Sequence, residues 1–300
     1  RRGPSIEAWS RWGGGAPALP QPALLGGLCL TGWSAAAKPP GVRRPASWVL
    51  GVALALSLAV GGCIDRPTEH RVRANAFLRA GEAEKALEEV KAGLDKSPDD
   101  VGLLMLQGKA LFELSRYDEA KTSYEAALEH GKDMGASALG EGYLGLAMVA
   151  LRQERFADAR QWFQKLVDTN DQDASAHINL ARLCLQLEDL PCAVEHGEAA
   201  GRLRGKSEDV LFTLGRIYIV AKKLDEAEKT FQHICEVVPR ASSCPYGVAL
   251  VAAQRGDKEA AMKKLEEAIA LKLPNPDKLG DDPLLAPLAD DPAFKKLAGK

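Results

Sequence analysis

The sequence predicts an all-α fold made of stacked helical hairpins, and three observations support that expectation. Ala, Leu, Glu and Lys dominate the 300 residues while aromatic side chains make up only 6%, a balance that favours helices over strands. A pattern of apolar and small residues recurs about every 34 residues, the length of a helix–turn–helix unit in repeat proteins. Gly or Ala also occupies equivalent positions in every unit, as expected where two helices cross closely.

Three segments set the phase of the repeat, at residues 116–129, 155–168 and 223–236. In the first, Tyr117 is followed three residues later by Ala120 and four residues after that by Tyr124. The same order recurs in the other two segments as Phe156, Ala159 and Phe163, and as Leu224, Ala227 and Phe231. This pattern resembles the tetratricopeptide repeat. The resemblance divides the chain into units at 67–100, 101–134, 140–173, 174–207, 208–241 and 242–275, with an insertion at 135–139.

The resemblance implies a right-handed solenoid of about six hairpins, in which small residues sit where the two helices of a unit meet. The expected positions on the first helices are Ala74, Gly108, Ala147, Ala181, Gly215 and Ala249. Those on the second helices are Ala86, Ala120, Ala159, Ala193, Ala227 and Ala261. Pro98 and Pro239 close their units because proline cannot continue a helix, whereas Pro245 is tolerable in the first turn of its helix.

The last 25 residues, 276–300, are expected to form short helices that cap the solenoid. Three pairs, Asn275-Pro276, Asp282-Pro283 and Asp291-Pro292, place an N-cap residue before a proline in the first helical position. Solenoids need such terminal caps for solubility. The residues expected to cover the last hairpin are Leu284, Leu285, Leu288, Phe294 and Leu297.

The first 62 residues are expected to lie outside the fold. Residues 1–41 are rich in Gly, Pro and Ala, and are interpreted as a disordered extension or, preferably, as upstream sequence translated in error. Residues 42–62 have the layout of a secretory signal peptide, with Arg43 and Arg44 before the apolar stretch Trp48 to Val60. That stretch is too short for a membrane-spanning helix, which needs about 20 residues.

The end of this signal, Val60-Gly61-Gly62-Cys63, resembles the bacterial lipoprotein box. The resemblance implies attachment of a diacylglyceryl group, with chains such as palmitate, to the Cys63 thiol, cleavage just before Cys63 so that its amine becomes the new N-terminus, and a short linker at 63–66. Two or more chains anchor a protein stably in a membrane. Ile64 follows the cysteine and Asp65 comes only second, which favours the outer membrane, facing the periplasm. The alternative is ordinary secretion, with Cys63 incidental.

Four further cysteines, Cys184, Cys192, Cys235 and Cys244, are predicted to form two local disulfides. Cys184 and Cys192 lie at nearly equal distances from the turn of one hairpin. Cys235 and Cys244 lie on either side of the turn between the fifth and sixth units, again at nearly equal distances from it. Disulfides are permitted in a secreted protein. The alternative is four reduced, buried thiols that act as small apolar side chains.

The first helices of the family line a concave groove, and two rows of large residues would lie there. One row is Met105, Leu144, Ile178, Phe212 and Tyr246, and the other is Leu78, Phe112, Leu151, Leu185 and Ile219. Between them lie three cations, Lys109, Arg182 and Arg216. An apolar trough flanked by cations suits an extended or helical peptide with apolar anchors and acidic groups. The alternative is that these rows pack within the solenoid.

The sequence thus predicts a lipid-anchored scaffold of the bacterial cell envelope that binds a protein or peptide partner, with no enzymatic activity, cofactor or metal. The first 62 residues hold six of the 39 Lys and Arg residues but one of the 41 acidic ones. The remainder is therefore mildly acidic, which argues against nucleic acid as a partner. Repeats with a lipid anchor are also similar to the pilotin lipoproteins that help assemble type IV pilus secretins. The other alternative is a structural spacer without a separate ligand.

Overall fold

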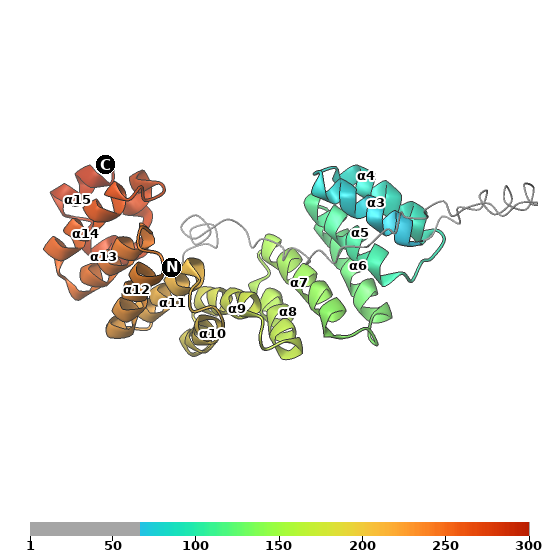
Figure 1. Cartoon of the computed structure of the whole chain (residues 1–300), viewed down its shortest axis with the longest axis horizontal. Coiled ribbons are helices and arrows are strands. Elements are labelled where there is room, and N and C mark those ends of the chain that lie inside the picture. The colour runs from blue at the N-terminus through green and yellow to red at the C-terminus, as the bar shows by residue number, and fades with distance from the viewer. Residues whose placement is uncertain (1–66, 300) are drawn as a thin grey trace, which may run out of the picture.

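The computed structural model describes residues 67–299, which form twelve helices arranged as six hairpins and a short C-terminal tail. The hairpins stack side by side into an arc, with α3 to α6 at one end and α13 to α15 at the other (Figure 1). The first four hairpins are α3 (Pro67–Arg79) with α4 (Ala83–Leu94), α5 (Val101–Glu113) with α6 (Tyr117–His130), α7 (Ala136–Arg152) with α8 (Phe156–Thr169), and α9 (Ala174–Gln186) with α10 (Leu190–Leu203). The last two are α11 (Glu208–Val220) with α12 (Leu224–Val237), and α13 (Ser243–Arg255) with α14 (Lys258–Ala270).

The predicted repeat boundaries agree with these hairpins except at the insertion before the third unit. Residues 135–139 were expected to separate two units, but α7 already begins at Ala136 and runs for 17 residues. The insertion therefore adds a turn to the start of α7 instead of forming a loop. Helix is the lower-energy choice there because the segment contains Ala136 and Ala138, and alanine has the highest helix propensity.

Each hairpin turns at the same repeat position, fifteen residues into the unit, with a left-handed backbone. Glycine supplies that conformation in the first and last units, at Gly81 and Gly256. The four central units use residues with a Cβ, which adopt φ near +60° at some conformational cost: Ser115, Glu154, Glu188 and Lys222. The repeat geometry thus fixes the turn even where the residue type does not favour it.

The predicted small residues lie where the helices approach one another, and the alanines among them are fully buried. The two glycines face aromatic rings. A Cβ on Gly108 would lie 2.7 Å from the ring of Tyr124, and one on Gly215 would lie 2.5 Å from the ring of Phe231. Only a residue without a Cβ leaves room for these rings, so the two glycines allow the aromatic cores of the second and fifth units to form.

Both predicted disulfides are present, with the predicted pairing. Cys184 is bonded to Cys192 across a hairpin turn, with Cα atoms 5.7 Å apart, and Cys235 to Cys244 between units, with Cα atoms 5.3 Å apart. The first bond joins the two helices of the fourth unit. The second joins the fifth unit to the sixth, so one bond stabilises a hairpin and the other links two consecutive units.

Breaking these bonds should destabilise the C-terminal half of the array. Closing loops of eight or nine residues restricts the unfolded chain by about 2–3 kcal/mol for each bond. We expect urea unfolding to show that reductant lowers the free energy of unfolding by that amount for each bond. A Cys184→Ala/Cys192→Ala variant, which lacks one of the two bonds, should show half of the loss that full reduction causes. Native, unreduced protein with four alkylatable thiols would contradict the assignment.

The tail folds back onto the array as η1 (Pro276–Asp281), η2 (Pro283–Leu288) and α15 (Pro292–Leu297). Two of its three predicted caps form: Asp282 accepts from the Leu284 amide, and Asp291 accepts from the amides of Ala293 and Phe294. The third prediction is wrong, because Asn275 adopts a left-handed backbone and its side chain caps nothing. Four of the predicted covering residues are buried and Leu297 is half-buried.

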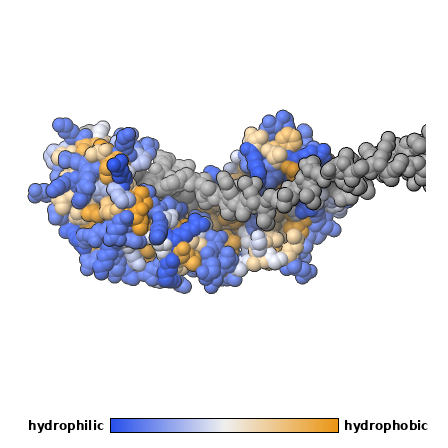
Figure 2. Space-filling view, in the orientation of Figure 1, coloured by the Kyte–Doolittle hydropathy of each residue, from blue (hydrophilic) through white to orange (hydrophobic). Residues whose placement is uncertain are grey.

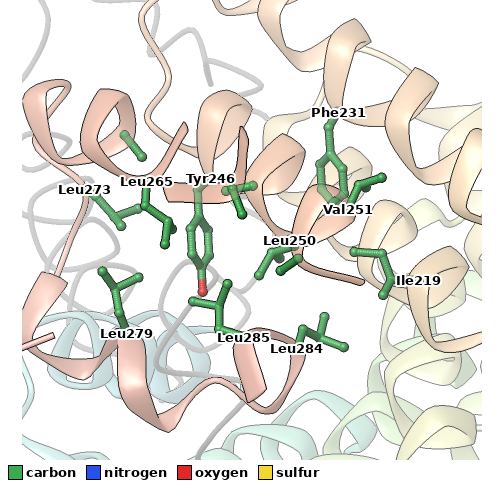
Figure 3. Close-up of a cluster of buried hydrophobic side chains, with 14 of the residues drawn as sticks. Ile219, Phe231, Tyr246, Leu250, Val251, Leu265, Leu273, Leu279, Leu284 and Leu285 are labelled. Carbon is green, nitrogen blue, oxygen red and sulfur yellow. The ribbon is translucent and has the colours of Figure 1, made fainter. Parts of the chain in front are cut away.

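The largest apolar cluster lies at the C-terminal end and includes the tail. Tyr246 stands at its centre, with Leu279, Leu284 and Leu285 of the tail beside it (Figure 3). Phe231 and Ile219 lie on the opposite side of Leu250 in the same view. The tail is therefore part of the core of the last two units and not only a cover over the end of α14.

Candidate protein-binding groove

The candidate site is the inner side of the arc, which the first helices of the units line. First helices touch one another in the pairs α3–α5, α5–α7, α9–α11 and α11–α13, whereas the second helices lie on the outer side (Figure 1). The residues predicted to face a ligand all belong to first helices, namely α3, α5, α7, α9, α11 and α13. The structure therefore places the predicted groove residues on one continuous face, although that face is not open along its whole length.

The N-terminal part of this face is open. Four of the predicted residues are half-buried there, on three consecutive first helices: Phe112 on α5, Leu144 and Leu151 on α7, and Leu185 on α9. The guanidinium of Arg152 lies 5.7 Å from the centre of the Phe112 ring. We call the surface formed by these four apolar side chains the open groove.

Of the other six members of the two predicted rows, Leu78 on α3 is half-buried and five are buried. Met105 and Ile178 are 5% and 4% exposed, and they pack beneath the open groove. At the C-terminal end Phe212, Ile219 and Tyr246 are 6%, 0% and 1% exposed. For these five residues the structure agrees with the packing alternative, and they offer no surface to a ligand in this conformation.

The three predicted cations are already paired with carboxylates, which corrects the expectation that they flank the groove for acidic ligand groups. Lys109 on α5 pairs with Glu141 on α7. Arg182 on α9 donates to Asp209 on α11 at 2.7 Å and to Thr213 at 2.8 Å. Arg216 on α11 pairs with Asp282 of the tail. Each cation thus joins one first helix to the next element along the inner face, and the guanidinium of Arg152 beside Phe112 adds a positive charge to the open groove.

The C-terminal end of the inner face is closed by the tail through a buried polar cluster. Arg216 donates to both oxygens of Asp282, at 2.6 and 3.1 Å, and the hydroxyl of Tyr246 donates to the same carboxylate at 2.5 Å. Gln254 Nε2 donates to the carbonyl of Leu284 at 2.7 Å. Phe212 stacks on Tyr246, with ring centres 5.9 Å apart.

Burial and charge act against each other in this cluster. Burial alone would raise the pKa of Asp282, but the Arg216 charge and the hydrogen bonds from Arg216 and Tyr246 hold that pKa below its ordinary value. Burial also raises the pKa of Tyr246 well above its ordinary value, and the nearby Asp282 carboxylate adds to the shift. At neutral pH the cluster therefore holds a carboxylate, a guanidinium and a neutral phenol.

One amide at the edge of the open groove has a shielded acceptor. Gln186 is the last residue of α9, directly after Leu185. Its Oε1 is inaccessible to water and accepts no hydrogen bond from the described residues. An unpaired buried acceptor costs free energy, so Gln186 lowers the stability of this end of α9.

A buried histidine pair lies inside the fourth unit, where the sequence showed no metal-like spacing. His177 Nε2 donates to the carbonyl of Asp171 at 3.0 Å, so its Nδ1 accepts from His196 Nδ1, 3.0 Å away. Burial lowers the pKa of His196, Glu195 and Asp168 oppose that shift, and His177 and Arg160 add to it. Residues 67–299 contain no cluster of three or more metal-ligating side chains.

The histidine pair should make the array less stable in mild acid. Because the pKa of His196 is lowered in the folded state, the unfolded chain binds the proton more readily, near its ordinary pKa of about 6.5. Stability is thus present above that pH and falls as the pH drops through it. We expect the free energy of unfolding to fall between about pH 7 and 5.5, and a His196→Gln variant to show a flatter profile. An unchanged slope in that variant would contradict this assignment.

The predicted lipid-attachment residue, Cys63, lies outside the described residues, as do the signal peptide at 42–62 and the segment 1–41. Within residues 67–299, no helix has both the length and the apolar character needed to cross a membrane. The face shown in Figure 2 is mainly hydrophilic, with apolar side chains scattered in small groups over both ends of the arc.

Comparison with known families decides what these hairpins are. The tetratricopeptide repeat family matches residues 71–138, 105–174 and 144–208, which cover the first four hairpins. The described chain is a tetratricopeptide repeat (TPR) array. The last two TPR units lie beyond the matched residues, but they have the same hairpin length and turn at the same repeat position. TPR arrays are protein-interaction scaffolds, so a protein or peptide is the expected class of partner.

Several solved TPR structures share this fold. A tetratricopeptide repeat protein from Parabacteroides merdae is 19% identical with a TM-score of 0.58, covering 78% of this chain and 97% of that one. YrrB, described as a TPR protein with an unusual peptide-binding site, is 20% identical with a TM-score of 0.52, covering 61% and 92%. The pilF protein of Pseudomonas aeruginosa is 15% identical with a TM-score of 0.55, covering 68% and 91%. At these identities the likeness shows the fold alone.

A curated human relative, protein O-mannosyl-transferase TMTC3, is 25% identical over 185 residues. The match covers 58% of this chain but only 20% of the human protein. The TPR array therefore spans about a fifth of that relative's length.

Proposed function

We propose that this protein is a non-catalytic scaffold of the bacterial cell envelope that holds an apolar segment of a partner protein in its open groove. The observation that carries this proposal is the half-buried row of Phe112, Leu144, Leu151 and Leu185 on three consecutive first helices. Further along the same face, the equivalent side chains are covered by the chain itself. Leu78 on α3 holds the equivalent position of the first unit and is also half-buried, so the apolar surface that the described residues leave for a partner lies on the first four units.

The electrostatics of the open groove define the partner segment more closely. Lys109 and Arg182 are neutralised by carboxylates on the neighbouring helices, so a strongly charged segment gains little there. Fully covering one leucine or phenylalanine side chain contributes about 1.5–3 kcal/mol. A segment with apolar residues on one side would fit this surface best.

The location in the envelope rests on the proposed lipid anchor at Cys63. A diacylated or triacylated cysteine would hold the array at the periplasmic side of the outer membrane, with the TPR units free to meet a partner. We expect the wild-type protein to incorporate labelled palmitate and to fractionate with membranes, and Cys63→Ser to lose both properties. Label and membrane association that persist in Cys63→Ser would contradict the anchor, and would leave the groove proposal unaffected.

The groove is tested by placing a photo-crosslinking amino acid at one position at a time in cells. Leu151 on α7 reports on the open groove, and Gln161, exposed on α8 of the same unit, is the matched control on the outer side. We expect a partner adduct from position 151 and none from 161. Adducts from 161 alone would contradict the groove and favour the spacer alternative, and a secretin crosslinked at 151 would favour the pilotin role.

A further inference from the structure

The tail docks on the array as a bound peptide docks on a receptor. Its contacts with the inner face come in a short run of sequence: the Asp282 carboxylate, the Leu284 carbonyl, and the side chains of Leu284 and Leu285. Both leucines are buried, at 9% and 1% exposed. Main-chain and side-chain contacts from a few consecutive residues are how extended peptides bind protein grooves.

The array supplies the receptor side of these contacts entirely from first helices. Arg216 comes from α11, and Tyr246 and Gln254 come from α13. These are the inner-face helices that continue the open groove toward the C-terminus. The tail thus occupies the position on the fifth and sixth units that a partner segment would occupy on the second to fourth.

The link between α14 and the tail adds strain and few contacts. Lys272 and Asn275 adopt φ of 63° and 50°, a left-handed conformation that is costly for residues with a Cβ. Lys272, Pro274 and Asn275 are exposed. Within the link only Leu273 is buried, so the docked state depends mainly on contacts of the tail itself: those around Asp282, Leu284 and Leu285, and the buried side chains of Leu279, Leu288 and Phe294.

We infer that the inner face of the fifth and sixth units is a second peptide-binding site, which recognises a carboxylate followed two and three residues later by a leucine pair. The tail fills this site in cis and keeps it closed to other segments. A partner segment of the same chemistry binds when the tail is displaced. The site is separate from the open groove, so this inference stands or falls independently of the proposed function.

The tether explains why the site is closed in the wild-type chain. A tail joined by a short link has an effective concentration of about millimolar or more at its own site, so a free peptide at micromolar concentration competes poorly. Weakening the tail's contacts should therefore raise the affinity for an added peptide, although the receptor residues are unchanged.

The test uses the full-length chain and a fluorescent peptide covering residues 279–299, with binding followed by anisotropy. We expect the wild-type chain to bind it weakly, and Asp282→Ala and Leu285→Ala chains to bind it at least about tenfold more tightly, because the tethered competitor is weakened. A peptide in which alanine replaces Asp282 should lose this affinity. Asp291→Ala is the matched control, since it removes a carboxylate cap of α15 that does not face the receptor helices.

Two outcomes would overturn the inference. One is that neither tail variant binds the peptide more tightly than the wild-type chain does, while circular dichroism shows that both retain their helices. The other is that Asp291→Ala raises the affinity as much as Asp282→Ala does. Either result would make the tail a fixed part of the fold and not a ligand of the array.

Discussion

Phe212→Ala should lower the free energy of unfolding by about 3–5 kcal/mol, the usual loss for truncating a buried phenylalanine. The ring is 6% exposed and lies 5.6 Å from the ring of Phe231 and 5.9 Å from that of Tyr246, measured between centres. Removing it leaves a cavity between the fifth and sixth units. Urea unfolding followed by circular dichroism measures the loss.

Phe112→Ala is the matched control, because the same substitution is made on the half-buried side of the inner face. We expect Phe112→Ala to lower the free energy of unfolding less than Phe212→Ala does, and to reduce partner crosslinking at the open groove. The Phe212→Ala variant should retain this crosslinking under conditions in which the variant is folded. Equal losses of stability for the two variants would contradict the division of the inner face into open and covered parts.

Arg216→Ala should also be strongly destabilising, by about 3–5 kcal/mol if the Asp282 carboxylate remains buried without its cation. The side chains of Arg216 and Asp282 are 6% and 0% exposed, so water cannot replace the lost partner without undocking the tail. Undocking limits the loss to the free energy that holds the tail in place. Hydrogen exchange should then show weaker protection of residues 283–297 than in the wild-type chain.

The pH dependence of the free energy of unfolding is the control for this prediction, because it reports on the ionisation of Asp282. The pKa of Asp282 is lowered in the folded state, so its contribution to stability is present above the unfolded pKa of about 3.9 and is lost as the pH falls below it. In Arg216→Ala the cation no longer lowers that pKa. The difference in stability between wild type and variant should therefore shrink in acid, and a constant difference down to pH 3 would contradict the ion pair.

The hairpins and the disulfides were predictable because their signals are local. Tyr117, Ala120 and Tyr124 lie on one helix, and their recurrence sets the phase of the array. Cys184 and Cys192 are eight residues apart across one turn, so hairpin geometry alone suggests the pair. The start of α7 was missed because the insertion itself has helix-forming residues.

The ion pairs of the inner face could have been predicted by aligning the units. Glu141 and Asp209 both occupy the second position of their units, one unit after Lys109 and Arg182 respectively. The sixth unit has Ser243 at that position, so Arg216 has no such carboxylate on the next helix. Its actual partner, Asp282, is 66 residues away in a segment without repeats, and no periodic signal points to it.

The buried histidine pair could also have been predicted by aligning the units. His177 and His196 occupy the fourth and twenty-third positions of their unit, and His70 and Glu89 occupy the same positions of the first unit, 2.9 Å apart. A hydrogen-bonded polar pair at these two positions thus occurs in two of the six units. A search for metal-ligand spacings along the sequence does not detect it, because the two positions lie on different helices.

Hydrogen exchange of the full-length protein, free and bound to the partner identified by crosslinking at Leu151, tests the central claim most directly. The open groove predicts new protection on binding in α5, α7 and α9, and no change in α11 and α13, which the tail already covers. Protection confined to the second helices, or spread over α11 and α13 with α5 and α7 unchanged, would contradict it.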